Sequence, residues 1–159
     1  SSGHQRIAEF VQQQWKDNLG VTVKLTNQEW KVYLVTTKSE NTPQMWRLGW
    51  CMDYPDENNF INEVFSVGGS SNPAKGGVPY GGINWMNDKF QTLVKQAAVE
   101  QDPKKRLDLY AQAEQILNVD DAAIIPLYWY TRVTVTQPWI KRTFSVGGHE
   151  IFNNWQVTQ

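Results

Sequence analysis

The stretch Trp46-Arg47-Leu48-Gly49-Trp50-Cys51-Met52-Asp53-Tyr54-Pro55-Asp56 decides the fold class of this chain. Its apolar part, Met45 to Trp50, is typical of a buried strand, and the apolar run stops abruptly at Asp53. A strand that ends in an aromatic residue and a carboxylate brings both groups to the edge of a sheet, where open α/β folds bind ligands. We therefore predict a ligand site in which Asp53 meets a cation, while Trp50 and Tyr54 supply flat apolar walls.

Apolar residues recur at helical spacing in several other segments, and most of these segments carry a start or stop signal. The signals are Gly20, Asp56, Asn87 or Asp88, and Asp102-Pro103, with a shorter helical pattern at 30–34. Three segments have the patterns of strands: 21–25, 45–50 and 122–130. Helices that alternate with strands predict one α/β domain over residues 1–159, with a mixed sheet flanked by helices.

The segment 66–84 differs from its surroundings because it contains three Gly-Gly pairs together with Pro73 and Pro79. Such a composition predicts a long mobile loop, which is either a functional loop beside the pocket or a solvated connector. No strand precedes it and no Gly-Lys-Ser/Thr follows, so it does not have the pattern of a phosphate-binding loop.

The composition narrows the function further. Fifteen basic and 16 acidic residues leave a net charge of −1, so no basic surface for nucleic acid or anionic membrane is indicated. Two histidines and one cysteine have no metal-ligand spacing, and no metal or other cofactor is expected. Eight tryptophans are unusually many, and they are either core and interface residues or a surface on which a ligand stacks.

Further sequence patterns follow one another in a recognisable order. In order and spacing, these patterns resemble the C-terminal lobe of an extracellular solute-binding protein of the oligopeptide and dipeptide permease family, family 5. Besides the Gly49 to Tyr54 core they are His4-Gln5-Arg6-Ile7-Ala8-Glu9, Trp15 to Gly20, Val21-Thr22-Val23, Asn27-Gln28-Glu29-Trp30, Asn58-Asn59-Phe60, Arg106 to Leu117 and Asp120 to Tyr128.

The resemblance implies one lobe of a two-lobed, type II periplasmic-binding-protein architecture that closes on its ligand by a hinge motion. It implies a non-enzymatic solute-binding component of an ABC importer, which delivers peptides to a membrane permease. The expected partners are the peptide, the second lobe of the same protein and the permease, and no nucleic acid. The expected location is periplasmic or extracellular, with membrane attachment through an upstream anchor if the protein is a lipoprotein.

The resemblance also implies roles for individual residues. An aspartate at the place of Asp53 receives the α-ammonium of the peptide, while Trp50 and Cys51 contact its backbone or first side chain. Three basic residues are expected to neutralise its terminal carboxylate: Lys38, Arg47 and His4. Other readings stay open, because Asp53 also suits a turn before a proline, Arg47 could pair with Asp53, and a histidine near a chain end often has no role.

Three other functions remain possible from the sequence. An oligosaccharide-binding member of the same family would use tryptophans for stacking, and a stand-alone carbohydrate-binding or interaction module would expose an aromatic platform. An enzyme is the least favoured reading, since Cys51 has no neighbouring histidine motif to serve as a base. Asp53 and Glu57 form a conceivable glycosidase pair, but nothing in the sequence places them opposite each other.

Overall fold

The computed structural model describes residues 2–158, and its contacts divide the chain into two units that meet at Val35 and Thr36. In the first unit, α1 (Ser2–Leu19) ends where Gly20 adopts a φ of +68°. The Gly20 amide donates to the Lys16 carbonyl at 3.1 Å, a closure that glycine permits because it has no Cβ. The predicted stop of the first helix is confirmed.

The short helix α2 (Trp30–Thr36) begins after Glu29 and reaches the junction between the units. Glu29 Oε2 accepts hydrogen bonds from the amides of Lys31 and Val32, which satisfies two amides that the first helical turn leaves unpaired. The short helix expected from residue 30 is therefore confirmed, and a side-chain cap explains why it starts there.

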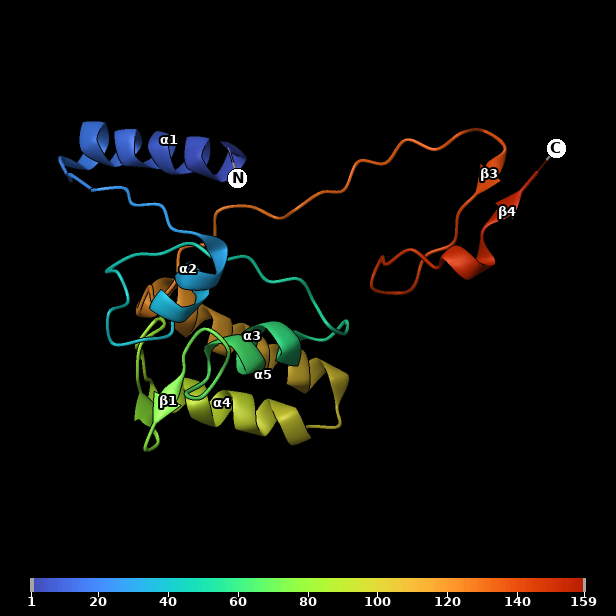
Figure 1. Ribbon diagram of the computed structural model, residues 1–159. Helices are drawn as coiled ribbons and strands as arrows, with labels where there is room; N and C mark the ends of the chain where they lie inside the picture. The colour runs from blue at the N-terminus through green and yellow to red at the C-terminus, as the bar shows by residue number, and fades with distance from the viewer. Residues whose placement is uncertain (1, 159) are drawn as a thin grey trace. The chain divides into compact units, whose positions relative to one another are not determined.

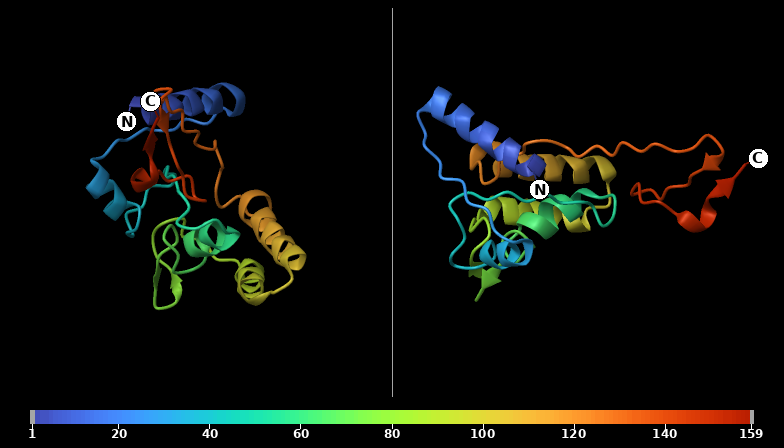
Figure 2. Two further views of the ribbon diagram at one scale, coloured as in Figure 1. Left: turned by 90° about the vertical axis from the view of Figure 1, so that its right-hand side faces the viewer. Right: turned by 45° about the horizontal axis from the view of Figure 1, so that its top comes forward.

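Three helices make the centre of the second unit: α3 (Glu57–Phe65), α4 (Asp88–Val99) and α5 (Pro103–Gln115). Each is capped as predicted, by Asp56, Asn87 and Asp102 respectively, whose side chains accept from amides of the first turn. The connection between α4 and α5 is short, so the two helices lie antiparallel and side by side, with α3 against both (Figures 1 and 2).

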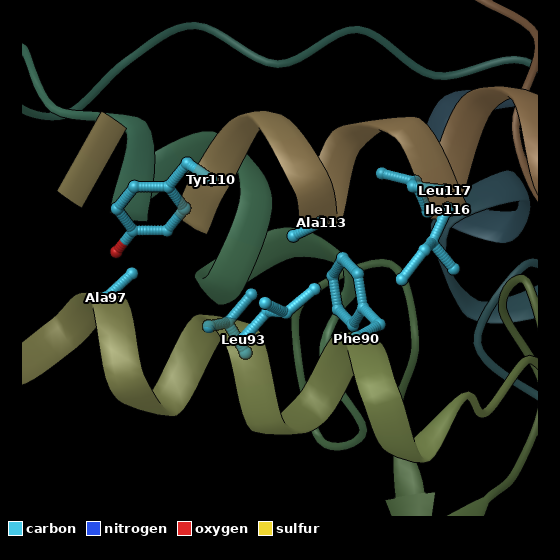
Figure 3. Close-up of a cluster of buried hydrophobic side chains, with 8 residues drawn as sticks. Phe90, Leu93, Ala97, Tyr110, Ala113, Ile116 and Leu117 are labelled. Carbon is cyan, nitrogen blue, oxygen red and sulfur yellow. The ribbon is translucent and has the colours of Figure 1, made fainter. Parts of the chain in front are cut away.

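The core of the second unit lies between α4, α5 and the π-helical turn η1 (Ile116–Asp120). Phe90, Leu93 and Ala97 on α4 face Tyr110, Ala113 and Ile116 (Figure 3). The amphipathic helix predicted after Asn87 or Asp88 is thus confirmed. On α5 the apolar side chains are only partly buried, because Leu107 remains 53% exposed while Tyr110 is 2% exposed.

The glycine-rich segment 66–84 is more structured than a loop without secondary structure. It contains an antiparallel hairpin of β1 (Ala74–Lys75) and β2 (Val78–Pro79), whose turn uses Gly76 and Gly77 at positive φ. The buried side chain of Asn72 donates to the carbonyls of Phe65 and Trp85 and so ties both ends of the segment together. The composition of the segment predicted its turns. It did not reveal that the Asn72 side chain bonds Phe65 and Trp85, which lie on either side of the segment in the sequence.

The sheets are smaller than the mixed sheet that the sequence predicted. Besides β1 and β2, a second antiparallel pair joins β3 (Ile140–Lys141) to β4 (Gln156–Val157), next to the short 3-10 helix η2 (Phe152–Asn154). The segments expected as strands, 21–25, 45–50 and 122–130, pair with no neighbouring strand within residues 2–158. An apolar run favours an extended backbone, but a strand also needs a partner about 4.8 Å away, which local sequence does not specify.

The β3–β4 hairpin is held by charged and aromatic side chains. Arg142 forms an ion pair with Glu150, and its guanidinium carbon lies 5.1 Å from the ring centre of Trp155 and 5.2 Å from that of Phe144. Such stacking of a cation on aromatic faces accounts for the aromatic residues in this part of the sequence. Within residues 2–158, no helix is both long and apolar enough to cross a membrane.

Candidate functional site

The predicted ligand site lies just before α3, where the chain turns into the helix. The Asp56 amide donates to the Tyr54 carbonyl at 3.0 Å, and Asp56 then caps α3. Asp53, Cys51 and Tyr54 are exposed on this turn, whereas Trp50 is half-buried. The extended run ends with a carboxylate, a thiol and a phenol ring at the surface, but at a helix start and not at the sheet edge that the sequence predicted.

One buried side chain, Asn59 on α3, holds this turn in place. Its Oδ1 accepts from the indole Nε1 of Trp50 at 2.9 Å and from the amide of Asp53 at 3.0 Å. Its Nδ2 donates to Asp53 Oδ2 at 3.3 Å and to Glu63 Oε2 at 2.8 Å. Asn59 is fully buried, so these four bonds replace all the hydrogen bonds that its amide would make with water.

A second set of polar contacts surrounds Tyr54. Its hydroxyl donates to Glu63 Oε1 and accepts from Asn58 Nδ2 at 2.7 Å. The bond to Glu63 raises the pKa of Tyr54 above its ordinary value, because the carboxylate stabilises the protonated phenol. Tyr54 is therefore a hydroxyl donor that is fixed by α3, in addition to the aromatic wall that the sequence predicted.

Asp56 has a structural role, as its position before the helix suggested. Besides capping α3 it forms an ion pair with Arg106 of α5, at 2.6 Å between Oδ1 and Nη2. The hydrogen bond from Arg106 holds the pKa of Asp56 below its usual value. Arg106 also lies over the ring of Tyr110, at 5.0 Å, and so connects the turn to the core.

Arg47 lies against two tyrosines from the segment 122–130. Its Nη2 donates to the hydroxyls of Tyr130 and, at 3.4 Å, of Tyr128, and its guanidinium carbon lies 5.8 Å from the centre of the Tyr130 ring. Gly49 leaves room for this contact, since a Cβ there would lie 3.2 Å from Tyr130. The segments 45–50 and 122–130, both predicted as strands, therefore contact each other through side chains and not through a strand pairing.

The two tyrosines have opposite electrostatic environments. Hydrogen bonding between the two hydroxyls raises the pKa of Tyr128 and lowers that of Tyr130. Hydrogen bonding and charge from Arg47 lower the pKa of Tyr130 further. This arrangement brings a guanidinium and two hydroxyls together, a set that could contact an acidic group. No pattern in the sequence marked Tyr128 or Tyr130 as a site residue.

The remaining predicted site residues lie elsewhere. Lys38 is exposed just after α2, and His4 lies half-buried on α1 in the first unit. Two shallow hollows occur in the second unit, one of about 520 Å³ between α4 and α5 and one of about 410 Å³ between residues 39–44 and 79–84. Asp53 and Trp50 line neither of these two hollows. Among the described residues, no group of three or more His, Cys, Asp or Glu side chains is placed to hold a metal ion.

Sequence reasoning missed the residues that organise the turn. Asn59 and Glu63 are ordinary polar residues of an amphipathic helix, and only their neighbours in space reveal their contacts. One signal was available: the Asn58-Asn59 pair places two amides in the first turn of α3, where asparagine is a poor helix former. Asparagine within a helix therefore indicates that its side chain forms hydrogen bonds with specific neighbouring groups.

Comparison with known proteins agrees with these observations. Residues 1–72 match the family described as bacterial extracellular solute-binding proteins, family 5 middle. The chain is 36% identical over 137 residues to the periplasmic oligopeptide-binding protein OppA of Salmonella typhimurium, covering 86% of this chain and 23% of the relative. It is 38% identical over 138 residues to the dipeptide-binding protein DppE of Bacillus subtilis, covering 87% of this chain and 23% of the relative.

A solved structure is similar as well. The unliganded, open form of the periplasmic murein tripeptide-binding protein MppA matches with a TM-score of 0.73 and 35% identity, over 89% of this chain and 25% of that one. This neighbour confirms the fold class as a mixture of helices and small sheets that is consistent with one lobe of a two-lobed binding protein. The relatives are named as binding proteins, and the chain spans about a quarter of their length. The resemblance to the extracellular solute-binding proteins of family 5 is thereby confirmed, over a stretch that aligns with about a quarter of such a protein.

Proposed function

We propose that this chain forms one side of a peptide-binding cleft in the solute-binding component of an ABC importer. In this proposal, the second lobe of the protein closes on the peptide, and the closed form delivers it to a membrane permease. The names of the relatives as oligopeptide- and dipeptide-binding proteins support peptides as the ligand class. They also support a periplasmic or extracellular location, and binding without catalysis.

The observation that carries the proposal is the state of the Asp53 carboxylate. Asn59 donates to Oδ2, while Oδ1 has no partner among residues 2–158, and the side chain is exposed. A carboxylate that is oriented on one oxygen and open on the other suits the α-ammonium of a peptide, because a charge-assisted hydrogen bond is short and strong. Trp50, Cys51 and Tyr54 then lie beside the first residue of the peptide.

Arg47 is the basic residue that we assign to a ligand carboxylate. Its guanidinium is oriented by the hydroxyls of Tyr128 and Tyr130, and these hydroxyls can also contact an acidic group. The same role for Lys38 and His4 rests on the family resemblance alone. Peptide binders of this kind gain affinity from main-chain hydrogen bonds and terminal charges, so we expect broad selectivity for side chains.

The test uses the full-length protein and isothermal titration with tripeptides that carry a free amino terminus. Asp53→Asn keeps the shape of the side chain and removes its charge. Once the second lobe encloses the pair, we expect this change to weaken binding by about 2–5 kcal/mol. Asp108→Asn, which replaces an exposed aspartate of α5, is the matched control and should bind as the unmodified protein does.

An N-acetylated tripeptide completes the experiment. It should bind the unmodified protein and Asp53→Asn equally weakly, because acetylation removes the ammonium. Equal affinity of the two proteins for the free-amine peptide would overturn the role of Asp53. Binding of xylo- or cello-oligosaccharides in place of peptides would favour the oligosaccharide-binding alternative, in which Trp50 is a stacking surface.

A further inference from the structure

We infer that Asn59 is the positioning residue of the amine site, which orients both Trp50 and Asp53 for the ligand. This inference rests on the proposed function and names the group on which the proposed site depends. Asn59 itself is fully buried and touches no ligand, whereas Asp53, which it binds, is exposed. It would therefore act through its neighbours.

The acceptor side of the Asn59 amide fixes the distance between the two ligand-contacting groups. One oxygen, Oδ1, accepts from the Trp50 indole at 2.9 Å and from the Asp53 amide at 3.0 Å. The indole plane and the backbone that carries the carboxylate are thus set by one atom. Because Asn59 belongs to the capped helix α3, the two groups on the exposed turn are tied to a regular element.

The donor side of the same amide orients the carboxylate. Nδ2 donates to Asp53 Oδ2 at 3.3 Å and to Glu63 Oε2 at 2.8 Å, so its two hydrogens serve two acidic side chains. An asparagine thereby lies between two carboxylates that would otherwise repel each other. The bond to Oδ2 leaves Oδ1 of Asp53 without a partner among residues 2–158 and available to an ammonium group.

No strand pairing holds the run before this turn among the described residues. The run 45–50 pairs with no strand within residues 2–158, and the apolar core of the second unit lies on α4, α5 and η1. The buried, fully bonded amide of Asn59 therefore supports the part of the turn that carries Trp50 and Asp53. The later part is held by other contacts, from Glu63 to Tyr54 and from Arg106 to Asp56.

The test compares substitutions of Asn59 in the full-length protein. Asn59→Asp is isosteric and keeps an oxygen for the Trp50 indole and the Asp53 amide. It replaces the two donor hydrogens of Nδ2 by a second oxygen, and so places a third carboxylate beside those of Asp53 and Glu63. We expect it to weaken binding of a free-amine tripeptide about tenfold or more, and to leave the weak binding of the N-acetylated tripeptide unchanged. Asn62→Asp is the matched control, because Asn62 lies on the same helix and bonds Asn58 and Ser66 instead of the turn.

A double-mutant cycle separates positioning from a general effect on the fold. If Asn59 acts through Asp53, then Asn59→Asp should cost little further affinity in a protein that already carries Asp53→Asn. Additive losses, or equal losses for both peptides, would show a merely structural role and overturn the inference. If Asp53→Asn alone leaves binding unchanged, the proposed function fails first. If Asp53→Asn weakens binding and Asn59→Asp does not, only this inference fails.

A measurement on the unmodified protein keeps the inference testable if the Asn59 variants do not fold. The side-chain amide protons of Asn59 give separate NMR signals, and Nδ2 bonds the carboxylate that would receive the ligand. A free-amine tripeptide should shift these signals and the Trp50 indole signal, whereas the N-acetylated tripeptide should shift the amide signals much less. Unchanged Asn59 signals at saturating free-amine peptide would overturn the inference.

Discussion

Nη2 of Arg106 on α5 lies 2.6 Å from Oδ1 of Asp56, the residue whose carboxylate caps α3. The Asp56 carboxylate thus accepts a hydrogen bond from a first-turn amide of α3 and also forms an ion pair with Arg106 of α5. The two side chains are about one quarter to one third exposed, so solvent weakens the pair without abolishing it. The contact anchors the turn that precedes α3, on which Asp53 and Tyr54 lie, to the helical core.

The ion pair predicts a pH dependence of stability. The pKa of Asp56 is lowered in the folded state by the hydrogen bond from Arg106. The carboxylate therefore adds stability above its unfolded value of 3.8, and this contribution is lost as the pH falls through the lower, folded value. Asp56→Asn keeps a capping oxygen but loses the charge, so we expect a loss of about 1 kcal/mol at neutral pH and a shallower loss of stability in acid.

The measurement is guanidinium unfolding of the chain at a series of values from about pH 7 to about pH 2. Asp102→Asn is the control, because Asp102 caps α5 in the same way, through the amides of Lys104 and Lys105. At neutral pH it should stay close to the unmodified chain. An Asp56→Asn variant that keeps the full acid dependence would assign that dependence to other carboxylates.

Gly82 and Gly76 form a matched pair for the packing of the segment 66–84. Both have nearly the same φ, +63° and +62° respectively. A Cβ at Gly82 would lie 2.2 Å from the carbonyl oxygen of Ser71, whereas nothing lies within 4 Å of one at Gly76. Gly76→Ala should therefore cost only the strain of a left-handed conformation, about 1–2 kcal/mol, and Gly82→Ala about 3 kcal/mol or more.

Thermal and guanidinium unfolding of the two variants give both values. Because the strain is common to the pair, the difference between them reports the close approach of Gly82 to Ser71. Equal stabilities would mean that the backbone at Gly82 moves away without cost.

Leu117 and Leu107 test the boundary of the core. Leu117 is fully buried on η1, whereas Leu107 on α5 is 53% exposed although both belong to the apolar pattern of the sequence. Leu117→Ala should lower the free energy of unfolding by about 2–5 kcal/mol, because it leaves a cavity among Phe90 and its neighbours. Leu107→Ala should change it by about 0.5 kcal/mol or less.

Guanidinium unfolding followed by circular dichroism measures both effects. A large loss for Leu107→Ala would show that this side chain is covered in solution. Such a result would identify a docking face for another part of the protein on α5.

The local signals of the helices were sufficient to predict where they begin. Asn87 and Asp102 cap the helices that follow them, and Pro103 stands at the first position of α5. Each signal acts within three or four residues, because a cap bonds amides of the adjacent turn. The apolar run 122–130 predicted a strand, but this segment pairs with no other strand within residues 2–158. Strand pairing is a contact between residues that are distant in the sequence, so an apolar run alone does not show whether a partner exists.

For the site, the sequence by itself determined that Trp50, Cys51, Asp53 and Tyr54 follow an apolar run and precede a capped helix. It also determined the family resemblance that makes Asp53 the proposed anchor of a peptide amine. Only the tertiary structure decided that Asn59 bonds Trp50 and Asp53, and that Arg47 lies against Tyr128 and Tyr130. The physical reason is that a hydrogen bond between side chains depends on the direction and distance of two groups, and folding sets these for residues as far apart as 47 and 130.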